Sequence, residues 1–213
     1  CLHYRRRFAA PGGAGRVLLH FGAVDQHARV WLNGQLLGEH SGGYDGFSFD
    51  VTDFLQPENE LLLETRDDLR DKTMPYGKQR RDRGGMWYTP VSGIWQTVWM
   101  EPVSGKHIEN LRITPDIDRN LLTVKAELNM ASPADLVEVN VYDGNRLVAT
   151  GKSINAEPVE VSMPRNAKLW SPDSPFLYTL EVTLRSSGKV VDKVDSYAAM
   201  RKYSTRRDEN GIV

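Results

Sequence analysis

Hydrophobic and polar residues alternate along most of this chain, and almost no segment shows the 3.6-residue period of an amphipathic helix. In the first half, the alternation predicts short strands joined by glycine-rich loops. The pair Asn33-Gly34 lies between two apolar runs and predicts a tight hairpin, because both central residues of such a turn adopt positive φ. Residues 52–55 are expected to form one helical turn, ended by Pro57. The expected strands are 4–8, 17–21, 28–32, 35–38, 47–51 and 61–65.

The second half predicts a separate β unit of about seven strands in roughly 95 residues, a spacing typical of an immunoglobulin-like sandwich. The triplet Asp143-Gly144-Asn145 reads as a hairpin turn within it. The chain has one cysteine, so no disulfide can brace this unit, and the fibronectin-type variant of the sandwich fits better. The expected strands are 108–114, 122–128, 137–141, 147–154, 159–163, 178–184 and 190–197.

Three of the five tryptophans lie in the stretch Met86–Trp99. Residues 94–99 predict one alternating strand, with residues 94, 96 and 98 facing one side and residues 95, 97 and 99 the other. Strand alternation favours a packing role for Trp95 and Trp99. Trp87 and Tyr88 are candidates for a stacking platform, since flat apolar rings beside polar groups suit the C–H faces of sugars. For Trp87, packing against a core is an equal alternative.

The other aromatic residues are assigned mainly to packing. Trp31 is expected in a core or on a sheet face, and Trp170 with Pro172 is expected to close the end of the second sandwich. Tyr44 follows the two glycines of the loop 42–46, where turn chemistry is the first interpretation.

Composition excludes several classes of function. The chain of 213 residues is 40% hydrophobic and 26% charged, with a net charge of -1, so we expect no nucleic-acid partner. No apolar run approaches the length of a membrane span. The single cysteine, Cys1, argues against a disulfide framework and a cysteine metal site. The sequence starts without a methionine and almost inside a predicted strand, so we expect a piece of a longer protein, with the cytoplasm as the default location.

The histidines show no ligand spacing, so neither a metal site nor a cofactor is predicted. The alternative is a structural Ca²⁺ bound by loop oxygens, with Asp25, Asp45 and Asp50 as the possible ligands.

A long segment with little pattern, residues 66–85, is the place to look for function, because such loops in compact domains are usually functional or disordered. It carries several carboxylates that could in principle supply a catalytic pair. We assign no catalytic residue, because a mobile loop does not hold two carboxylates at a fixed separation; solvated charges facing the nearby arginines explain them better. These carboxylates are Asp67, Asp68, Asp71 and Asp82.

A series of motifs, each weak alone, resembles glycoside hydrolase family 2, the family of β-galactosidases, β-glucuronidases and β-mannosidases. Order, spacing and chain length between the motifs all fit. The resembling stretches are residues 17–24, Val30-Trp31-Leu32-Asn33-Gly34, 38–44, 49–52, Trp87-Tyr88-Thr89-Pro90, Ser92-Gly93-Ile94-Trp95-Gln96 and Leu169-Trp170-Ser171-Pro172.

The resemblance implies an all-β chain with a jelly-roll sugar-binding domain over 1–103, whose first strand is expected to be missing, and an immunoglobulin-like sandwich over 107–204. Residues 205–213 would begin the linker to a TIM barrel that carries both catalytic glutamates in the family. The implied partner is a carbohydrate substrate held with that barrel, and the parent is expected to form homo-oligomers.

In the family, the loop corresponding to 67–92 reaches over the barrel mouth, which makes Asp82, Trp87 and Tyr88 the substrate-binding candidates here. Several galactosidases place an aspartate where this sequence has Gly85 or Trp87, which argues against direct galactose contact. Two alternatives remain open: a stand-alone carbohydrate-binding module, and a structural or adhesion-type pair of β-sandwiches.

Overall fold

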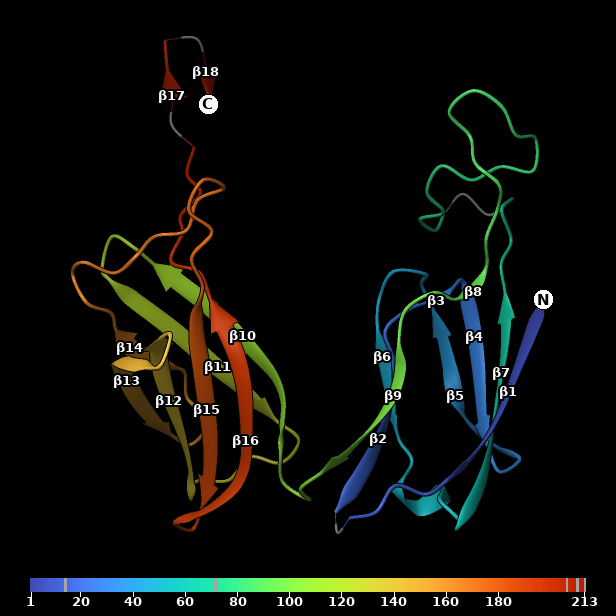
Figure 1. Ribbon diagram of the computed structural model, residues 1–213, viewed down its shortest axis with the longest axis horizontal. Coiled ribbons are helices and arrows are strands. Elements are labelled where there is room, and N and C mark those ends of the chain that lie inside the picture. Colours follow the sequence, from blue (N-terminus) through green and yellow to red (C-terminus); the bar gives the residue numbers. More distant parts are fainter. Residues whose placement is uncertain (14, 71–72, 206, 210, 213) are drawn as a thin grey trace. The chain divides into compact units, whose positions relative to one another are not determined.

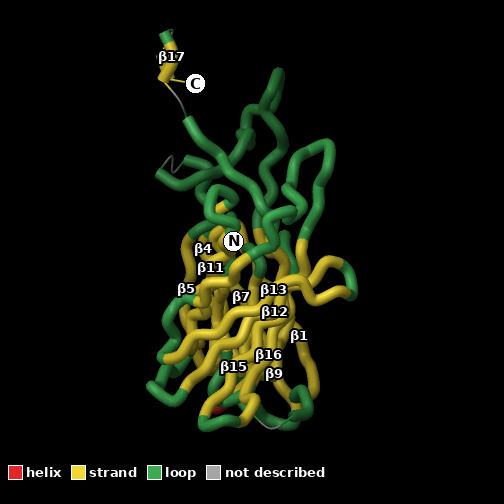
Figure 2. The backbone as a smooth tube through the Cα atoms, turned by 90° about the vertical axis from the view of Figure 1, so that its left-hand side faces the viewer, coloured by secondary structure: helices red, strands yellow, loops and turns green. Residues whose placement is uncertain are grey.

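The structure is a computed structural model that describes residues 1–13, 15–70, 73–205, 207–209 and 211–212. The chain forms two compact units, Cys1–Val103 and Ser104–Val213. Strands and loops make up nearly all of the described chain, and its one short helix is a 3₁₀ turn (Figure 2). The predicted all-β fold is therefore confirmed. No helix in the described part has the length and apolar character needed to cross a bilayer.

The first unit is an antiparallel β-sandwich. One sheet has the order β1-β7-β4-β5 and a second has the order β6-β2-β9, while β3 and β8 form a small ladder near one end (Figure 1). The elements are β1 (Leu2–Ala9), β2 (Arg16–Phe21), β3 (Val24–Asp25), β4 (His27–Leu32), β5 (Gln35–Ser41), β6 (Phe47–Asp50), η1 (Thr52–Phe54), β7 (Glu58–Arg66), β8 (Gly93–Ile94) and β9 (Val98–Val103).

Alternating apolar residues from both sheets form the core of this unit. Leu19 and Phe21 come from β2, and Val30, Leu32 and Leu63 come from the opposite sheet; all five are almost fully buried. Burial of such a side chain stabilises the fold by about 1.5–3 kcal/mol. Burial of these alternating residues is therefore the main contribution to the packing of the two sheets.

The predicted hairpin at Asn33-Gly34 is confirmed, with φ of 52° and 80° at its two central residues. The Asn33 amide also donates to the Phe54 carbonyl at 2.9 Å and accepts from the Glu60 N–H at 2.8 Å. The hairpin is thus tied to the 3₁₀ turn that the sequence predicted before Pro57 and to the start of β7.

The prediction of one continuous strand over residues 94–99 is wrong. β8 ends at Ile94 and β9 begins at Val98, so the chain leaves the small ladder and joins the β6-β2-β9 sheet. At the crossing, a Cβ on Gly22 would lie 2.8 Å from the Gln96 Cβ, and the Gly22 N–H donates to the Thr97 carbonyl at 2.8 Å. Gly22 therefore lies close against residues 96–97, and the chain between β8 and β9 does not continue as a regular strand.

The second unit is also an antiparallel sandwich, with a β10-β11-β14 sheet and a β13-β12-β15-β16 sheet. Inward-facing Val137, Val139 and Val141 are buried against Leu122 and Val124 from the other sheet. The elements are β10 (Ile108–Asp116), β11 (Leu121–Leu128), β12 (Asp135–Asp143), β13 (Arg146–Ile154), β14 (Val159–Ser162), β15 (Tyr178–Ser186) and β16 (Lys189–Ala198), followed by the short hairpin β17 (Arg207–Asp208) and β18 (Gly211–Ile212).

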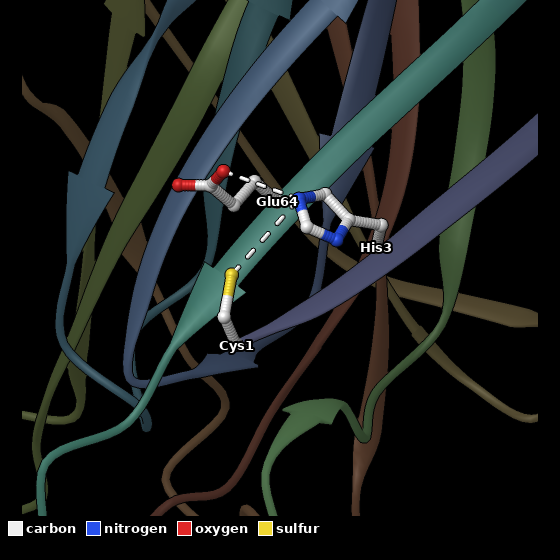
Figure 3. Close-up of side chains that lie close together, drawn as sticks. All are labelled: Cys1, His3 and Glu64. Carbon is white, nitrogen blue, oxygen red and sulfur yellow. Dashed lines mark hydrogen bonds and ion pairs between the residues drawn. The ribbon is translucent and has the colours of Figure 1, made fainter.

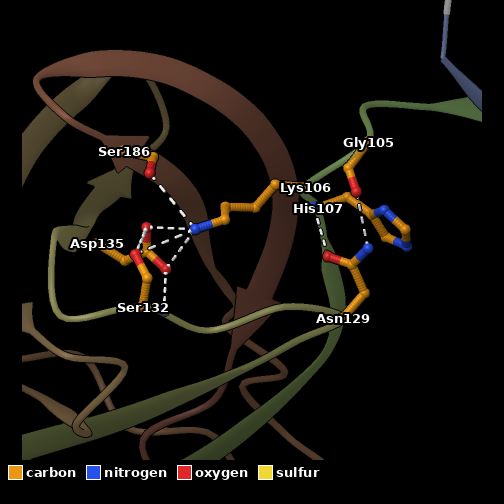
Figure 4. Close-up of polar contacts among 7 residues, drawn as sticks. All are labelled: Gly105, Lys106, His107, Asn129, Ser132, Asp135 and Ser186. Carbon is orange, nitrogen blue, oxygen red and sulfur yellow. Dashed lines mark hydrogen bonds and ion pairs between the residues drawn. The ribbon is translucent and has the colours of Figure 1, made fainter.

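A polar cluster anchors the beginning of the second unit (Figure 4). The Asp135 side chain is fully buried and accepts two hydrogen bonds from the Lys106 ammonium group, at 2.8 and 2.9 Å. The Ser132 N–H donates to the same carboxylate at 2.7 Å. Beside this pair, the Asn129 side chain accepts from the His107 N–H at 2.9 Å and donates to the Gly105 carbonyl at 2.9 Å.

Candidate functional site

The first unit has a hollow of about 220 Å³ at the end where β3 pairs with β8 and where the long β7–β8 connection begins. Figure 1 shows this connection extending beyond the strands at that end of the unit. We call the hollow the aromatic hollow, and the residues that define it are Asp25, Gly43, Tyr44, Gln79, Ser92 and Trp95.

Glycine makes the wall of the aromatic hollow possible. A Cβ at Gly43 would lie 2.6 Å from Oδ1 of Asp25, so any larger residue at this position would push the carboxylate away from the loop. Gly93 has φ of +101°, a conformation that favours glycine. The glycines that the sequence presents as turn residues therefore also shape the hollow.

Two exposed aromatic rings form one side of the hollow. Tyr44 and Trp95 are 55% and 52% exposed, and their ring centroids lie 5.9 Å apart in an edge-to-face arrangement with an interplanar angle of 74°. The Trp95 indole N–H donates to the Gly43 carbonyl at 2.7 Å, which fixes the ring against the glycine loop. An indole held by its polar edge leaves its apolar face free for a ligand.

Polar groups complete the hollow. Burial raises the pKa of the Asp25 carboxyl, and the nearby Asp67 carboxylate adds to the rise. The Ser92 hydroxyl donates to Asp67 at 2.7 Å, and the Gln79 side chain accepts from the Val91 N–H at 2.6 Å. The combination of apolar rings with a few fixed hydrogen-bonding groups is the usual construction of a small-molecule site.

Trp87 and Tyr88, the candidates for a stacking platform, lie outside the aromatic hollow. Trp87 is half-buried, and the Arg80 guanidinium lies over its ring at 3.6 Å from the centroid, so a cation already occupies one aromatic face. Tyr88 is 67% exposed, and its backbone pairs with Lys78 and Arg80. These contacts order the loop without bringing Trp87 or Tyr88 into the aromatic hollow.

Asp82 lines a second depression, of about 430 Å³, within the same connection. Three arginines line it with Asp82, namely Arg70, Arg80 and Arg81, so the depression is basic where the aromatic hollow is acidic. Arg70 is already paired with Asp68 through two hydrogen bonds of 3.0 and 3.1 Å.

The loop carboxylates are engaged with other groups. Hydrogen bonds from Arg70 hold the pKa of Asp68 below its usual value, as expected for a charge partner rather than a proton donor. Asp67 accepts from Ser92, and Asp71 lies outside the described residues. Among the proposed calcium ligands, Asp50 is paired with Arg16 and accepts from Thr52, and Asp25, Asp45 and Asp50 form no cluster of three ligand groups within the described chain.

The sequence analysis did not predict that Tyr44 and Trp95 would lie together. Strand alternation favoured a packing role for Trp95 and Trp99, and in the structure their exposed fractions are 52% and 45%. Trp99 stacks on His20 on the outer face of its sheet, with centroids 4.7 Å apart. Trp31 is half-buried on a sheet face beneath Arg29, as predicted. The signal for the Tyr44–Trp95 pair was the two flanking glycine motifs, 42–43 and 92–93, which the fold brings together.

The fold and the hollow define the class of protein first: a tandem of two antiparallel β-sandwiches, the first with an aromatic depression at its loop end. Residues 2–90 match the glycosyl hydrolase 2 galactose-binding-like domain, and residues 106–201 match glycosyl hydrolases family 2. The two matches lie one after the other and together cover most of the chain. The chain belongs to glycoside hydrolase family 2.

Relatives with known names agree with this assignment. The chain is similar to a β-galactosidase of Thermoanaerobacter pseudethanolicus, with 28% identity over 91% of this chain and 27% of that protein. It is also similar to a β-glucuronidase of Paenibacillus borealis, with 27% identity over 93% of this chain and 36% of that protein. The chain therefore spans about a quarter to a third of these relatives.

Solved structures show the same fold. A β-glycosidase from Bacteroides vulgatus superposes with a TM-score of 0.77 at 24% identity, covering 99% of this chain and 27% of that one. A β-glucuronidase from Ruminococcus gnavus in complex with D-glucuronic acid superposes with a TM-score of 0.77 at 18% identity, covering 99% and 38%. At these identities the likeness is one of architecture.

Proposed function

We propose that this chain is the non-catalytic β-sandwich part of a retaining family 2 glycosidase that hydrolyses β-linked glycosides, and that the aromatic hollow forms part of the rim of its substrate pocket. The observation that carries the proposal is the Tyr44–Trp95 pair beside Asp25, on a chain of this family. Retaining glycosidases need two carboxylates about 5–5.5 Å apart in a rigid setting. The resemblance assigns that pair to a catalytic barrel, and we assign none here.

The chemistry of the hollow favours a neutral sugar unit or leaving group. Tyr44 and Trp95 present apolar faces for sugar C–H groups, while Asp25 and Ser92 offer acceptors and a hydroxyl for sugar hydroxyls. The carboxylates of Asp25 and Asp67 lie near each other, so a uronate carboxylate at this place would meet repulsion. The catalytic residues would hold the sugar whose bond is cleaved. The rim therefore suits the next unit of the substrate, the neutral sugar or leaving group beyond that bond.

Kinetics of the longer protein that contains this chain test the proposal. Trp95→Ala removes the ring while leaving the glycine loop in place, and we expect kcat/KM on a β-linked disaccharide to fall about tenfold, equivalent to about 1.4 kcal/mol. Activity on the same sugar with a small aryl leaving group should fall less. Trp31→Ala is the matched control, because that tryptophan lies on a sheet face under Arg29.

An unchanged kcat/KM for Trp95→Ala on both substrates would remove the rim assignment. The exposed aromatic pair also fits a stand-alone carbohydrate-binding module, which makes a different prediction for the isolated chain. Titration of residues 1–213 with neutral β-galactosides and with β-glucuronides, followed by tryptophan fluorescence, separates the two functions. Saturation in the micromolar range would favour the stand-alone module; absence of saturation there supports the rim.

A further inference from the structure

Three potential metal ligands meet on the outer face of the β1–β7 ladder (Figure 3). Sγ of Cys1 lies 4.0 Å from Nε2 of His3, and that nitrogen lies 3.2 Å from Oε2 of Glu64. With one ligand atom taken from each residue, the three atoms lie within 4.8 Å of one another. In the part of the chain that the structure describes, no other group of three or more histidine, cysteine and acidic side chains does so.

The strand geometry produces this cluster. Cys1 comes directly before β1 and is two residues from His3, the spacing that puts side chains of an extended chain on the same side. His3 pairs directly with Glu64 in the antiparallel register, which places the carboxylate opposite the imidazole. Because the sequence separation of 61 residues hides this contact, ligand spacing along the chain did not reveal it.

We propose that Cys1, His3 and Glu64 bind a divalent transition-metal ion of the zinc type, with water as the fourth ligand. Thiolate, imidazole and carboxylate are the donors that Zn²⁺ takes in tetrahedral sites, with metal–ligand distances of about 2.0–2.3 Å. Two ligands at that distance and a tetrahedral angle lie roughly 3.5 Å apart. The separations of 4.0 and 3.2 Å lie on either side of this value, and the third pair of ligand atoms lies within 4.8 Å.

The donor set selects the kind of ion. A thiolate and an imidazole are poor ligands for Ca²⁺ and Mg²⁺, which take oxygen, whereas they suit Zn²⁺ and its neighbours in the first transition row. A thiolate and a carboxylate together balance the charge of a divalent ion, with the imidazole neutral. His3 has a side chain 70% exposed and Cys1 is also exposed, so an ion reaches the cluster directly from solvent.

A neighbouring contact supports Glu64 as a ligand. The Arg66 Nε donates to Oε1 of Glu64 at 2.9 Å, which leaves Oε2 directed at the cluster. The Arg66 contact thus orients the carboxylate, and partners outside the ligand set commonly orient metal ligands in this way.

Binding at this place would join the beginning of β1, an edge strand, to the interior strand β7. An ion that binds only the folded state raises the melting temperature by an amount that grows with its free concentration. Binding also releases the thiol proton to solvent, because the thiolate is the ligand.

Cobalt titration tests the site, since Co²⁺ accepts the same ligands and reports a bound thiolate by a near-ultraviolet charge-transfer band. The protein is residues 1–213 behind a Gly-Ser leader, so that a free amine on Cys1 does not act as a ligand. We expect a one-to-one complex that Zn²⁺ displaces. His3→Ala and Glu64→Gln should each weaken Co²⁺ binding by about tenfold or more, and Cys1→Ser should abolish the band.

His27→Ala is the matched control, because His27 belongs to β4 of the same sheet and bonds to Ser41 instead. It should bind Co²⁺ like the parent chain. Glu64→Gln preserves side-chain shape, and circular dichroism confirms that each variant is folded. The proposal fails if no saturable band appears, or if the band keeps its affinity in both His3→Ala and Glu64→Gln, which would show binding by the thiol alone.

Discussion

Replacing Lys106 with methionine should destabilise the second unit by about 3 kcal/mol at neutral pH. The substitution removes the cation that donates two hydrogen bonds to the fully buried Asp135 carboxylate (Figure 4). Removing one partner of a buried ion pair costs about 3–5 kcal/mol, because the other charge stays buried without compensation. The Ser132 N–H still donates to the carboxylate at 2.7 Å, which places the expected cost at the lower end.

The cost should depend on pH in a defined direction. Burial acts to raise the pKa of Asp135, but the hydrogen bonds from Lys106, Ser186 and Ser132 outweigh it and hold the pKa below its usual value. The ion pair therefore stabilises the fold above the unfolded pKa of about 3.9, and this stabilisation is lost as pH falls through the lower folded pKa. In Lys106→Met the buried carboxylate has no cation, so its folded pKa rises and the deficit shrinks toward acid pH.

Urea denaturation followed by ¹⁹F NMR of 5-fluorotryptophan gives the free energy of unfolding for the second unit alone, because Trp170 is the one tryptophan of the five that lies in it. Spectra are compared near neutral pH and at about pH 4. The double variant Lys106→Met/Asp135→Asn removes both charges and should recover part of the loss. A neutral-pH deficit below about 1 kcal/mol, or one that does not shrink in acid, would refute the reasoning.

Three further substitutions in the first unit have definite expected results. Gly38→Ala would place a Cβ 2.6 Å from Cε1 of Phe49, and overpacking of this kind costs about 1–3 kcal/mol, which the urea midpoint of the first unit measures. Asn33→Ala removes the amide that ties the hairpin to η1 and β7 at a position with φ of 52°, so we expect a loss of about 2 kcal/mol or more in the same assay. Arg80→Ala uncovers the Trp87 ring, so acrylamide should quench the tryptophan fluorescence of the chain more efficiently.

Local patterns were sufficient for most of the fold. Two-residue alternation located nearly every long strand, and Asn33-Gly34 located its hairpin because the turn geometry depends on those two residues alone. The break between Ile94 and Val98 was missed for the opposite reason. It depends on the approach of Gly22, more than 70 residues earlier, to Gln96, and no pattern within 94–99 records that contact.

The candidate site was harder to predict for the same physical reason. Composition indicated aromatic residues near a glycine-rich loop, but the partner of Trp95 is Tyr44, which only the folded sandwich brings within 5.9 Å. The predicted candidates Trp87 and Tyr88 remain untested as substrate contacts. The Arg80 guanidinium over Trp87 could not be foreseen, because cation–π contacts in loops carry no periodic signal.

Turnover of chromogenic β-glucuronides and β-galactosides by residues 1–213 alone, compared with turnover by the longer protein encoded in the same reading frame, is the most direct measurement. If these sandwiches only shape the pocket, the short chain is inactive and the longer protein is active. Hydrolysis by the short chain that a single Asp25→Asn substitution abolishes would contradict the assignment and move the catalytic residues into this polypeptide.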